Sequence, residues 1–304
     1  DNVPVIDFGM RRAHGGEAGM WAARACYLTG FTATATCLGS ARYGIPPTGT
    51  MAHAFILAHE LEIEAFERFA RSHPNNVVLL IDTFDVARGA KRVVEVAKRL
   101  APEGIRIHAV RIDSGDLAAN ARITREILDD GGLCETKIIV SGGLDEYRIE
   151  TLIDSAAPIY GVGVGSNVDT SADQPFLDSA YKLHYFRDRP RGKHAHGKTD
   201  LPGCKQVFRQ FNAAGQIEAD TIGLFDEPVE GQALLQTVMR NGQQTDRQRA
   251  IDLEQSRAHC AQSLTTLPPA LRQLHRTTAF PVLISDGLEA LRQELAKAAE
   301  KGLV

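Results

Sequence analysis

Four apolar runs in the first part of the chain each end in a polar or glycine-rich loop that precedes helical apolar spacing. The runs are 77–81, 105–112, 138–140 and 159–162, and the loops after them are 82–85, 113–116, 141–143 and 163–166. Strands that recur at intervals of roughly 20–30 residues, with a helix between each pair, are typical of repeated βα units. The sequence therefore predicts an α/β fold built on a parallel sheet or barrel.

Helical spacing and turn residues predict where the helices lie. In the first part of the chain we predict helices at about 17–29, 35–43, 53–72, 87–100, 116–130 and 144–155. The pattern changes near residue 181, where a basic, loop-like stretch precedes two strands and two helices. These lie at 205–209, 221–225, 245–263 and 285–301. We therefore predict a main βα segment over 1–180 and a C-terminal part over 181–304.

Composition excludes several classes of protein. The 304 residues are 43% hydrophobic, enough to bury a large core, and the formal net charge of −4 argues against a nucleic-acid-binding protein. No apolar run approaches the length of a transmembrane helix, and no basic stretch is followed by the apolar run of a signal peptide, so we expect neither. The five cysteines are widely spaced and never form CxxC, which is typical of reduced thiols. We expect a cytoplasmic protein without nucleic-acid or membrane partners.

The polar residues at the strand ends are candidates for an active site. They are Asp82, Asp85, Arg111, Asp113, Ser114, Asp116 and Ser141. In (β/α) barrels the active site lies at the carboxyl ends of the strands. The alternative is that each one caps the following helix, and this stays open for Asp85, Asp116 and Ser141.

The two glycine-rich loops, 141–143 and 163–166, favour a phosphorylated ligand. Glycine allows a phosphate to approach backbone N–H groups closely, and two such loops on successive strands late in a barrel form a recurring phosphate site. A dinucleotide is less favoured, because no GxGxxG connects a first strand to a helix.

Three basic residues have more than one interpretation. His53 begins a predicted helix and is either a simple cap or a functional group. Arg11 and Arg12, beside a glycine-rich loop, either bind an anion or form a surface charge pair. We predict no metal-ligating residues.

Considered together, these segments resemble the nicotinate phosphoribosyltransferase family over most of the chain. The matching segments are 7–15, 44–46 with 49–53, 81–85, 111–117, 141–146, 163–166 and 201–207. The resemblance implies an irregular (β/α) barrel of parallel strands with additional C-terminal strands and helices, usually preceded by an N-terminal domain. That domain is absent from this chain, which begins at Asp1, so we expect the chain to be the latter part of a longer or processed polypeptide.

The resemblance also implies an activity. Family members transfer the phosphoribosyl group of phosphoribosyl pyrophosphate to nicotinic acid, giving nicotinate mononucleotide and pyrophosphate in NAD salvage. They couple this transfer to ATP hydrolysis through a phosphorylated histidine, and Mg²⁺ accompanies pyrophosphate and ATP. We therefore expect an ATP-dependent enzyme that acts on small molecules and forms a homodimer.

Residue roles follow from the matching positions. Phe8 would stack on the pyridine ring, Arg11 would hold phosphates of the donor, and His53 would be the phosphorylated histidine. Arg111 and Asp113 would flank the ring and the ribose. A carboxylate at Asp113 suits an oxocarbenium-like transition state, in which positive charge develops on the sugar.

The remaining predicted contacts concern the phosphate and the ring. The phosphate would lie on the glycine-rich loops, and the substrate-binding positions that the resemblance adds are Thr34, Ser141, Gly142, Gly143, Gly165 and Ser166. The sequence departs from the family where Thr34-Ala35-Thr36 replaces Thr-Ser-Asn and where Gly143 replaces a frequent Asp. The absence of an acidic residue near Ala35 favours nicotinate over its amide.

Two alternatives remain at this point. One is a related enzyme that acts on nicotinamide or quinolinate. The other is a non-catalytic subunit that binds phosphoribosyl compounds, which the missing N-terminal region keeps open.

Overall fold

The computed structural model describes residues 3–171, 173–195, 198–246, 252–275 and 279–301. The chain divides into two compact units, Asp1–Phe176 and Leu177–Val304, which are considered separately below. None of the described helices is long and apolar enough to cross a membrane.

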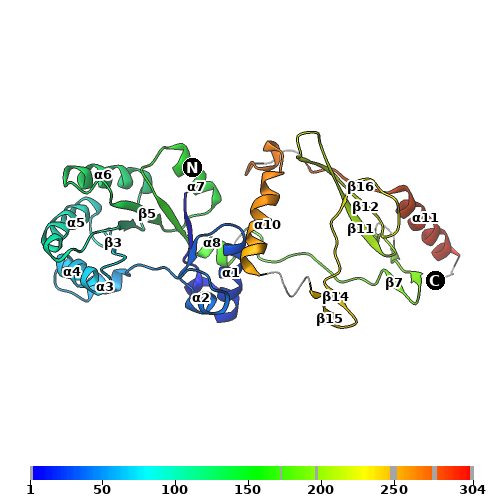
Figure 1. Cartoon of the computed structure of the whole chain (residues 1–304), viewed down its shortest axis with the longest axis horizontal. Coiled ribbons are helices and arrows are strands. Elements are labelled where there is room, and N and C mark those ends of the chain that lie inside the picture. The colour runs from blue at the N-terminus through cyan, green and yellow to red at the C-terminus, as the bar shows by residue number, and fades with distance from the viewer. Residues whose placement is uncertain (1–2, 172, 196–197, 247–251, 276–278, 302–304) are drawn as a thin grey trace. The chain divides into compact units, whose positions relative to one another are not determined.

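The first unit is a parallel sheet covered by helices (Figure 1). Its strands are β1 (Val5–Asp7), β2 (Ala33–Thr34), β3 (Val78–Leu80), β4 (Ala109–Ile112), β5 (Lys137–Ser141) and β6 (Gly161–Val164). They follow the order β2-β1-β6-β5-β4-β3, and every pairing is parallel. The predicted α/β fold of parallel strands, with additional C-terminal strands and helices, is therefore confirmed, and the six strands of the predicted irregular barrel form a half-barrel.

The helices of the first unit follow the strands in chain order. They are η1 (Met10–Arg12), α1 (Gly16–Leu28), α2 (Cys37–Tyr43), α3 (His53–Leu57), α4 (Glu62–Ser72), α5 (Val86–Leu100), η2 (Ala101–Glu103), α6 (Leu117–Asp130), α7 (Glu146–Asp154) and α8 (Ser166–Asp169). Helices α4, α5 and α6 pack successively beside one another on the strands β3 and β4 (Figure 1).

The hydrophobic core lies between this sheet and its helices. All of β3 is buried, which is typical of a parallel strand covered on both faces. From α5 the side chains of Val93, Val96 and Leu100 face the core, while its lysines and arginines stay at the surface. The 3.6-residue spacing of these apolar positions explains why this segment is a helix on the sheet.

Three aspartates at strand ends cap helices. Asp85 accepts a hydrogen bond from the backbone N–H of Arg88, and Asp116 accepts one from Ala119, so these residues begin α5 and α6. Asp145 begins α7 in the same way. The capping interpretation holds for Asp85 and Asp116, and Ser141 instead contacts other strand-end side chains.

Some predicted boundaries were wrong. The helix predicted at 53–72 is two helices, α3 and α4, because the chain becomes extended at Leu61 (φ −124°, ψ 132°). The strand predicted at 105–112 begins only at Ala109. Part of the helix predicted at 245–263 falls on residues 247–251, which lie outside the described residues.

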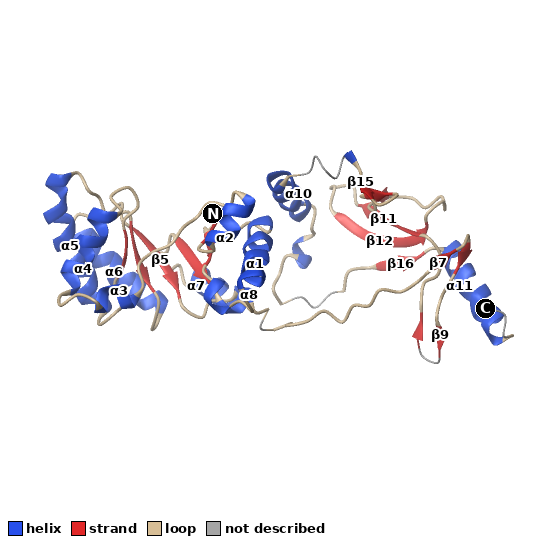
Figure 2. Ribbon diagram, turned by 90° about the horizontal axis from the view of Figure 1, so that it is seen from below, coloured by secondary structure: helices blue, strands red, loops and turns tan. Residues whose placement is uncertain are grey.

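The second unit is built on a mixed sheet (Figure 2). Its described elements are β7 (Tyr185–Phe186), β8 (Arg189–Pro190), β9 (His194–Ala195), β10 (Lys198–Thr199), β11 (Lys205–Phe211), β12 (Ile217–Leu224), β13 (Gln232–Ala233), β14 (Met239–Arg240), β15 (Gln243–Gln244), α10 (Leu253–Thr265), η3 (Pro269–Leu271), β16 (Val282–Ile284) and α11 (Asp286–Glu300). The sheet order is β13-β11-β12-β16, and α11 packs on β12. The predicted strands 205–209 and 221–225 overlap β11 and β12.

Candidate active site

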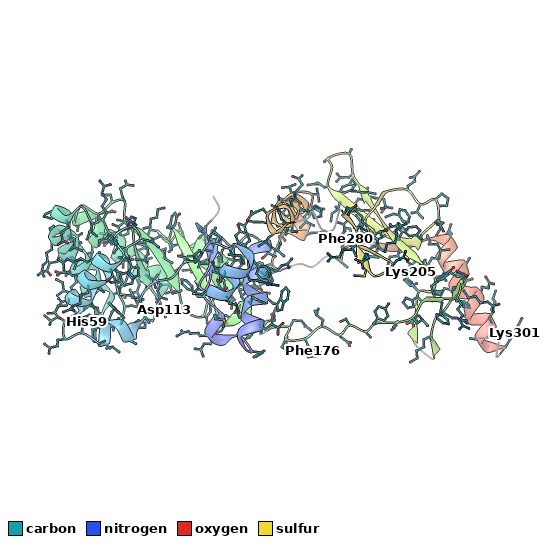
Figure 3. All side chains as sticks on the ribbon, turned by 60° about the horizontal axis from the view of Figure 1, so that its bottom comes forward. His59, Asp113, Phe176, Lys205, Phe280 and Lys301 are labelled. Carbon is teal, nitrogen blue, oxygen red and sulfur yellow. The ribbon has the colours of Figure 1, made fainter. Side chains whose placement is uncertain are left out.

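Loops at the carboxyl ends of the strands enclose a cavity of about 570 Å³ in the first unit. This volume suits a small-molecule ligand. The lining residues are Phe8, Arg11, Arg12, Ala35, Gly49, Thr50, Met51, Ala52, His53, Ala54, Arg111, Asp113, Ser141, Gly142, Gly143, Gly163, Gly165 and Ser166. Figure 3 labels Asp113, which marks the cavity within this unit.

All of the predicted site residues except Thr34 line this cavity. Thr34 is buried in β2, and its hydroxyl donates to Asp7 Oδ2 at 2.6 Å. Side chains alternate along a strand, so the next residue, Ala35, lines the cavity instead. Thr34 therefore lies behind the cavity wall, and it does not make the direct contact predicted from the resemblance.

Arg111 joins three segments of the site. Its Nη1 lies 3.1 Å from Asp113 Oδ1 and 3.1 Å from Ser141 Oγ, and its Nη2 donates to the carbonyl of Met51 at 3.0 Å. These bonds fix the guanidinium plane, because the donors of arginine form a rigid fork. The guanidinium lies over the ring of Phe8, 5.7 Å from its centroid.

Gly163 of β6 sets the position of the Phe8 ring. A Cβ on Gly163 would lie 2.3 Å from the ring carbon Cδ2 of Phe8, far inside van der Waals contact. The backbone N–H of Phe8 donates to the carbonyl of Val164 at 2.7 Å. The ring therefore rests directly on β6, with one face toward Arg111.

Asp113 is held by its neighbours on the sheet. Its backbone N–H donates to Asp82 Oδ2 at 2.9 Å, and the hydroxyl of Ser141 donates to its Oδ1. The other oxygen of Asp82, Oδ1, is buried and accepts no hydrogen bond. That oxygen lies 3.9 Å from Nε2 of His53.

His53 presents one ring nitrogen to these carboxylates. Its Nδ1 lies 3.0 Å from Thr83 Oγ1, and its Nε2 lies 3.9 Å from Asp113 Oδ2. The side chain is 40% exposed. A half-exposed imidazole with one nitrogen held by a hydroxyl leaves the other nitrogen accessible to a reactant.

The two glycine-rich loops face the same cavity. Gly142 has φ +102°, and a Cβ there would lie 2.0 Å from the carbonyl oxygen of Asp113, so this position requires glycine. The amide of Asn167 donates to the carbonyl of Leu144 at 3.0 Å and so ties one loop to the other. Free N–H groups in glycine-rich turns are typical of phosphate sites.

The charge of the lining is predominantly positive. Three arginines, Arg11, Arg12 and Arg111, line the cavity with one carboxylate, Asp113. Burial lowers the pKa of Arg111, an effect that Asp113 and Asp82 oppose and Arg11 reinforces. The negative charge of an incoming anion would stabilise the guanidinium and oppose this effect of burial, so the lining favours an acidic ligand.

Some contacts of the site have no signature in the sequence. The carbonyl of Met51 binds Arg111 through its backbone, which no residue type reveals. Asp82 and Thr83 follow β3, and their strand-end position is a usable signal, although nothing in the spacing pairs them with His53. Ala35 has no side-chain chemistry that predicts a place on the cavity lining, and only the family resemblance points to its position.

Comparison with known proteins identifies related sequences. Residues 3–187 match the model of the nicotinate phosphoribosyltransferase (NAPRTase) family, and residues 228–292 match that of the nicotinate phosphoribosyltransferase C-terminal domain. A nicotinate phosphoribosyltransferase of Mycobacterium tuberculosis is 44% identical over 300 residues, covering 98% of this chain and 64% of the relative. The Bacillus subtilis enzyme of the same name is 38% identical over 239 residues, covering 76% of this chain and 48% of the relative.

Solved structures share the fold. Human nicotinic acid phosphoribosyltransferase superimposes with a TM-score of 0.80 at 24% identity, over 96% of this chain and 70% of the human one. A nicotinate-nucleotide pyrophosphorylase from Pyrococcus furiosus gives a TM-score of 0.69 at 25% identity, over 86% of this chain and 66% of its own. The chain spans less than two thirds of the length of the Mycobacterium relative. Because the family models match most of its first unit and part of its second, the chain belongs to the nicotinate phosphoribosyltransferase family.

Proposed function

We propose that this chain transfers the 5-phosphoribosyl group of phosphoribosyl pyrophosphate to nicotinate, forming nicotinate mononucleotide and pyrophosphate. The observation that carries the proposal is one cavity that combines an aromatic–guanidinium slot with two glycine-rich loops. The first suits a flat acidic ring and the second suits a phosphate. Family membership supports the same reaction.

Phe8 and Arg111 form the ring slot of this proposal. The pyridine ring would stack on Phe8, with its negative carboxylate near the arginines of the lining. The described lining contains no carboxylate beside Ala35, so no negative charge there would favour the amide group of nicotinamide. These features favour nicotinate over nicotinamide.

The chemistry requires one bond to form and one to break at the anomeric carbon. The ring nitrogen of nicotinate attacks C1 of the ribose, and the bond from C1 to the pyrophosphate oxygen breaks with its electron pair. Positive charge develops on the sugar, and the carboxylate of Asp113 stabilises it. Ser141 and Arg111 hold that carboxylate in place through their hydrogen bonds.

Pyrophosphate departs as a highly charged anion, which the arginines and Mg²⁺ would neutralise. Among the described residues no group of three or more histidine, cysteine, aspartate or glutamate side chains could hold a metal ion. Mg²⁺ is commonly held by substrate phosphates with one or two carboxylates, so the phosphates of the donor would carry the ion in this proposal. Arg11 and Arg12 lie on the lining, where they can contact the phosphates.

His53 is the proposed site of phosphorylation by ATP. Because Thr83 occupies Nδ1, the nitrogen that would attack the γ-phosphate is Nε2. Incubation with ATP labelled at the γ-phosphate should give an acid-labile phosphoprotein. The label should disappear in His53→Ala and remain in His59→Ala, a histidine of the same region that does not line the cavity. Label that persists in His53→Ala would refute this assignment.

Steady-state assays with three pyridines test the substrate. We expect product from nicotinate at a kcat/KM well above that from nicotinamide or quinolinate. A preference for nicotinamide or quinolinate would favour the alternative enzymes, and binding of phosphoribosyl pyrophosphate without any product would favour a non-catalytic subunit. The homodimer and the cytoplasmic location stay predictions.

A further inference from the structure

Two buried carboxyl groups lie directly behind the loop that carries Phe8 and Arg11. Asp169 is the last residue of α8, and both of its carboxyl oxygens are buried and accept no hydrogen bond. A Cβ on Gly9 would lie 2.0 Å from the Asp169 carboxyl carbon, so this carboxyl rests against the backbone of residue 9. Any side chain at position 9 would displace it.

The second carboxyl group, Asp7, accepts three hydrogen bonds and retains acceptor capacity for one more. Its Oδ1 accepts from the backbone N–H of Gly9 at 2.8 Å. Its Oδ2 accepts from the hydroxyls of Thr34 at 2.6 Å and Thr36 at 3.3 Å. Three donors stabilise a negative charge on Asp7, and Asp7 thereby connects the loop after β1 to the loop after β2, where Ala35 lines the cavity.

The two carboxyl groups can bond to each other only if one carries a proton, because ionised carboxylates are acceptors alone. The proton belongs on Asp169, since Asp7 already accepts from three donors and Asp169 accepts from none. Burial, the negative charge of Asp7 and the hydrogen bond to Asp7 all raise the pKa of Asp169, to about 7.

Among the described neighbouring groups, none supplies a positive charge to the pair in place of that proton. From α1, the thiol of Cys26 faces the pair, and burial and the two carboxylates raise its pKa to about 12, which keeps it neutral. The charged side chains of the neighbouring elements make other contacts. Arg11 and Arg12 of η1 line the cavity, Glu17 of α1 accepts a hydrogen bond from Trp21, and Arg24 lies over the ring of Tyr43.

We propose that Asp169 is a positioning residue for the pyridine end of the cavity, a neutral carboxylic acid that donates its proton to Asp7 and thereby fixes the loop of Phe8 and Arg11. This inference rests on the proposed phosphoribosyl transfer. Asp169 does not line the cavity, so it acts through Asp7 and Gly9.

Loss of the Asp169 proton would leave two negatively charged carboxylates, those of Asp7 and Asp169, close together behind the loop that carries Phe8 and Arg11. Because the pKa of Asp169 in the folded chain is raised above its ordinary value of 3.8, the folded state binds this proton more tightly than the unfolded state does. The stability contribution is present at low pH and is lost as the pH rises from about 4 through about 7. Binding at the cavity should weaken over the upper part of that range.

The variant Asp169→Asn tests the proposal, because its side-chain amide donates to Asp7 at every pH. Between about pH 6 and about pH 8.5, KM for nicotinate and for phosphoribosyl pyrophosphate in the unaltered chain should rise at least about threefold relative to KM in Asp169→Asn. The kcat values of the two should stay similar. The matched control Asp154→Asn, an exposed carboxylate at the end of α7, should follow the unaltered chain.

A ratio of KM values that stays constant over this pH range would overturn the proposal, as would an equal loss of binding in Asp169→Asn at about pH 6. Thermal unfolding and calorimetric binding of phosphoribosyl pyrophosphate provide readouts that need no turnover. The midpoint of unfolding should fall more steeply with pH in the unaltered chain than in Asp169→Asn. If no chain forms product, the proposed function fails, while these two measurements still decide the role of Asp169.

Discussion

Arg111 connects segments of the site that are far apart in the sequence. Its guanidinium bonds Asp113, Ser141 and the carbonyl of Met51, and it lies over the ring of Phe8. The arginine therefore positions the proposed ring slot and the proposed charge-stabilising carboxylate together. A residue with these contacts should be sensitive to the shape of its head group as well as to its charge.

Replacing Arg111 by lysine tests this dependence on shape. Lysine keeps the charge but cannot reproduce the planar fork, and hydrogen bonds to charged groups contribute about 1.5–3 kcal/mol each. We expect kcat/KM for nicotinate to fall by roughly 100-fold in Arg111→Lys. The control is Arg122→Lys, at an exposed arginine that bonds the carbonyl of Ser155. Comparable activity in Arg111→Lys and Arg122→Lys would contradict the role given to Arg111.

Gly163 provides a second test at the residue scale. A methyl group there would lie 2.3 Å from Phe8 Cδ2, so the ring must move. In Gly163→Ala we expect KM for nicotinate to rise by roughly tenfold and stability to fall by about 1–3 kcal/mol. Gly16→Ala is the control, because its added methyl would meet only Met10 Cε at 3.9 Å. Unchanged KM in Gly163→Ala would show that the ring does not bind substrate.

At the scale of elements, helix starts and site residues occupy equivalent places after the strands. Asp85 and Asp116 cap α5 and α6, whereas Ser141 and Asp113 bond to each other across the sheet. Both sets are short polar residues after apolar runs, so the sequence alone cannot separate them. The contacts in the structure distinguish the helix caps from the site residues, and substitutions should distinguish them as well.

Substitution at Asp85 and Ser141 should therefore have opposite profiles. Asp85→Ala removes a helix cap and should lower the free energy of unfolding by about 1 kcal/mol, with kcat/KM unchanged. Ser141→Ala removes a partner of Asp113 and Arg111 and should lower kcat/KM. Chemical denaturation and steady-state kinetics on both variants measure the two effects. A kinetic defect in Asp85→Ala with none in Ser141→Ala would reverse the assignment.

Elements with strong periodicity could be predicted from the sequence, and packing decided the rest. The strands β3 and β5 and the helix α5 follow their apolar patterns closely. The break between α3 and α4 could not be predicted, because no proline or glycine marks it and the apolar spacing continues through it. Ile56 and Phe66, one from each of the two helices, both lie in the hydrophobic core.

The site could be predicted to a similar degree. Residues with side-chain chemistry at strand ends, such as Asp113 and Ser141, were accessible from the pattern and the family resemblance. The family resemblance implies a substrate contact for Thr34, but in the structure its hydroxyl donates to the buried Asp7. The Asp7–Asp169 pair could not be predicted, since it joins residues far apart in the sequence through packing against Gly9.

At the scale of the whole chain, the cavity belongs entirely to the first unit. The first unit ends at Phe176 and the second begins at Leu177. Figure 3 labels Phe176. Residues 174–184 form neither helix nor strand, and Phe176, Leu177 and Tyr181 are largely exposed.

Limited proteolysis tests this division. Exposed connections without secondary structure are preferred cleavage sites, and chymotrypsin cuts after aromatic residues and leucine. We expect the first cut within 176–183, giving two fragments that mass spectrometry identifies. A first cut inside β3, α5 or β11 would contradict the division into two units.

The most direct measurement for the central claim is product formation by the purified chain. Incubation with nicotinate, phosphoribosyl pyrophosphate, ATP and Mg²⁺ should give nicotinate mononucleotide and pyrophosphate in equal amounts, detected by chromatography with mass spectrometry, and Arg111→Ala should lose both products. A folded chain that binds phosphoribosyl pyrophosphate but forms no nicotinate mononucleotide, or an Arg111→Ala variant that forms it at the unaltered rate, would contradict the account.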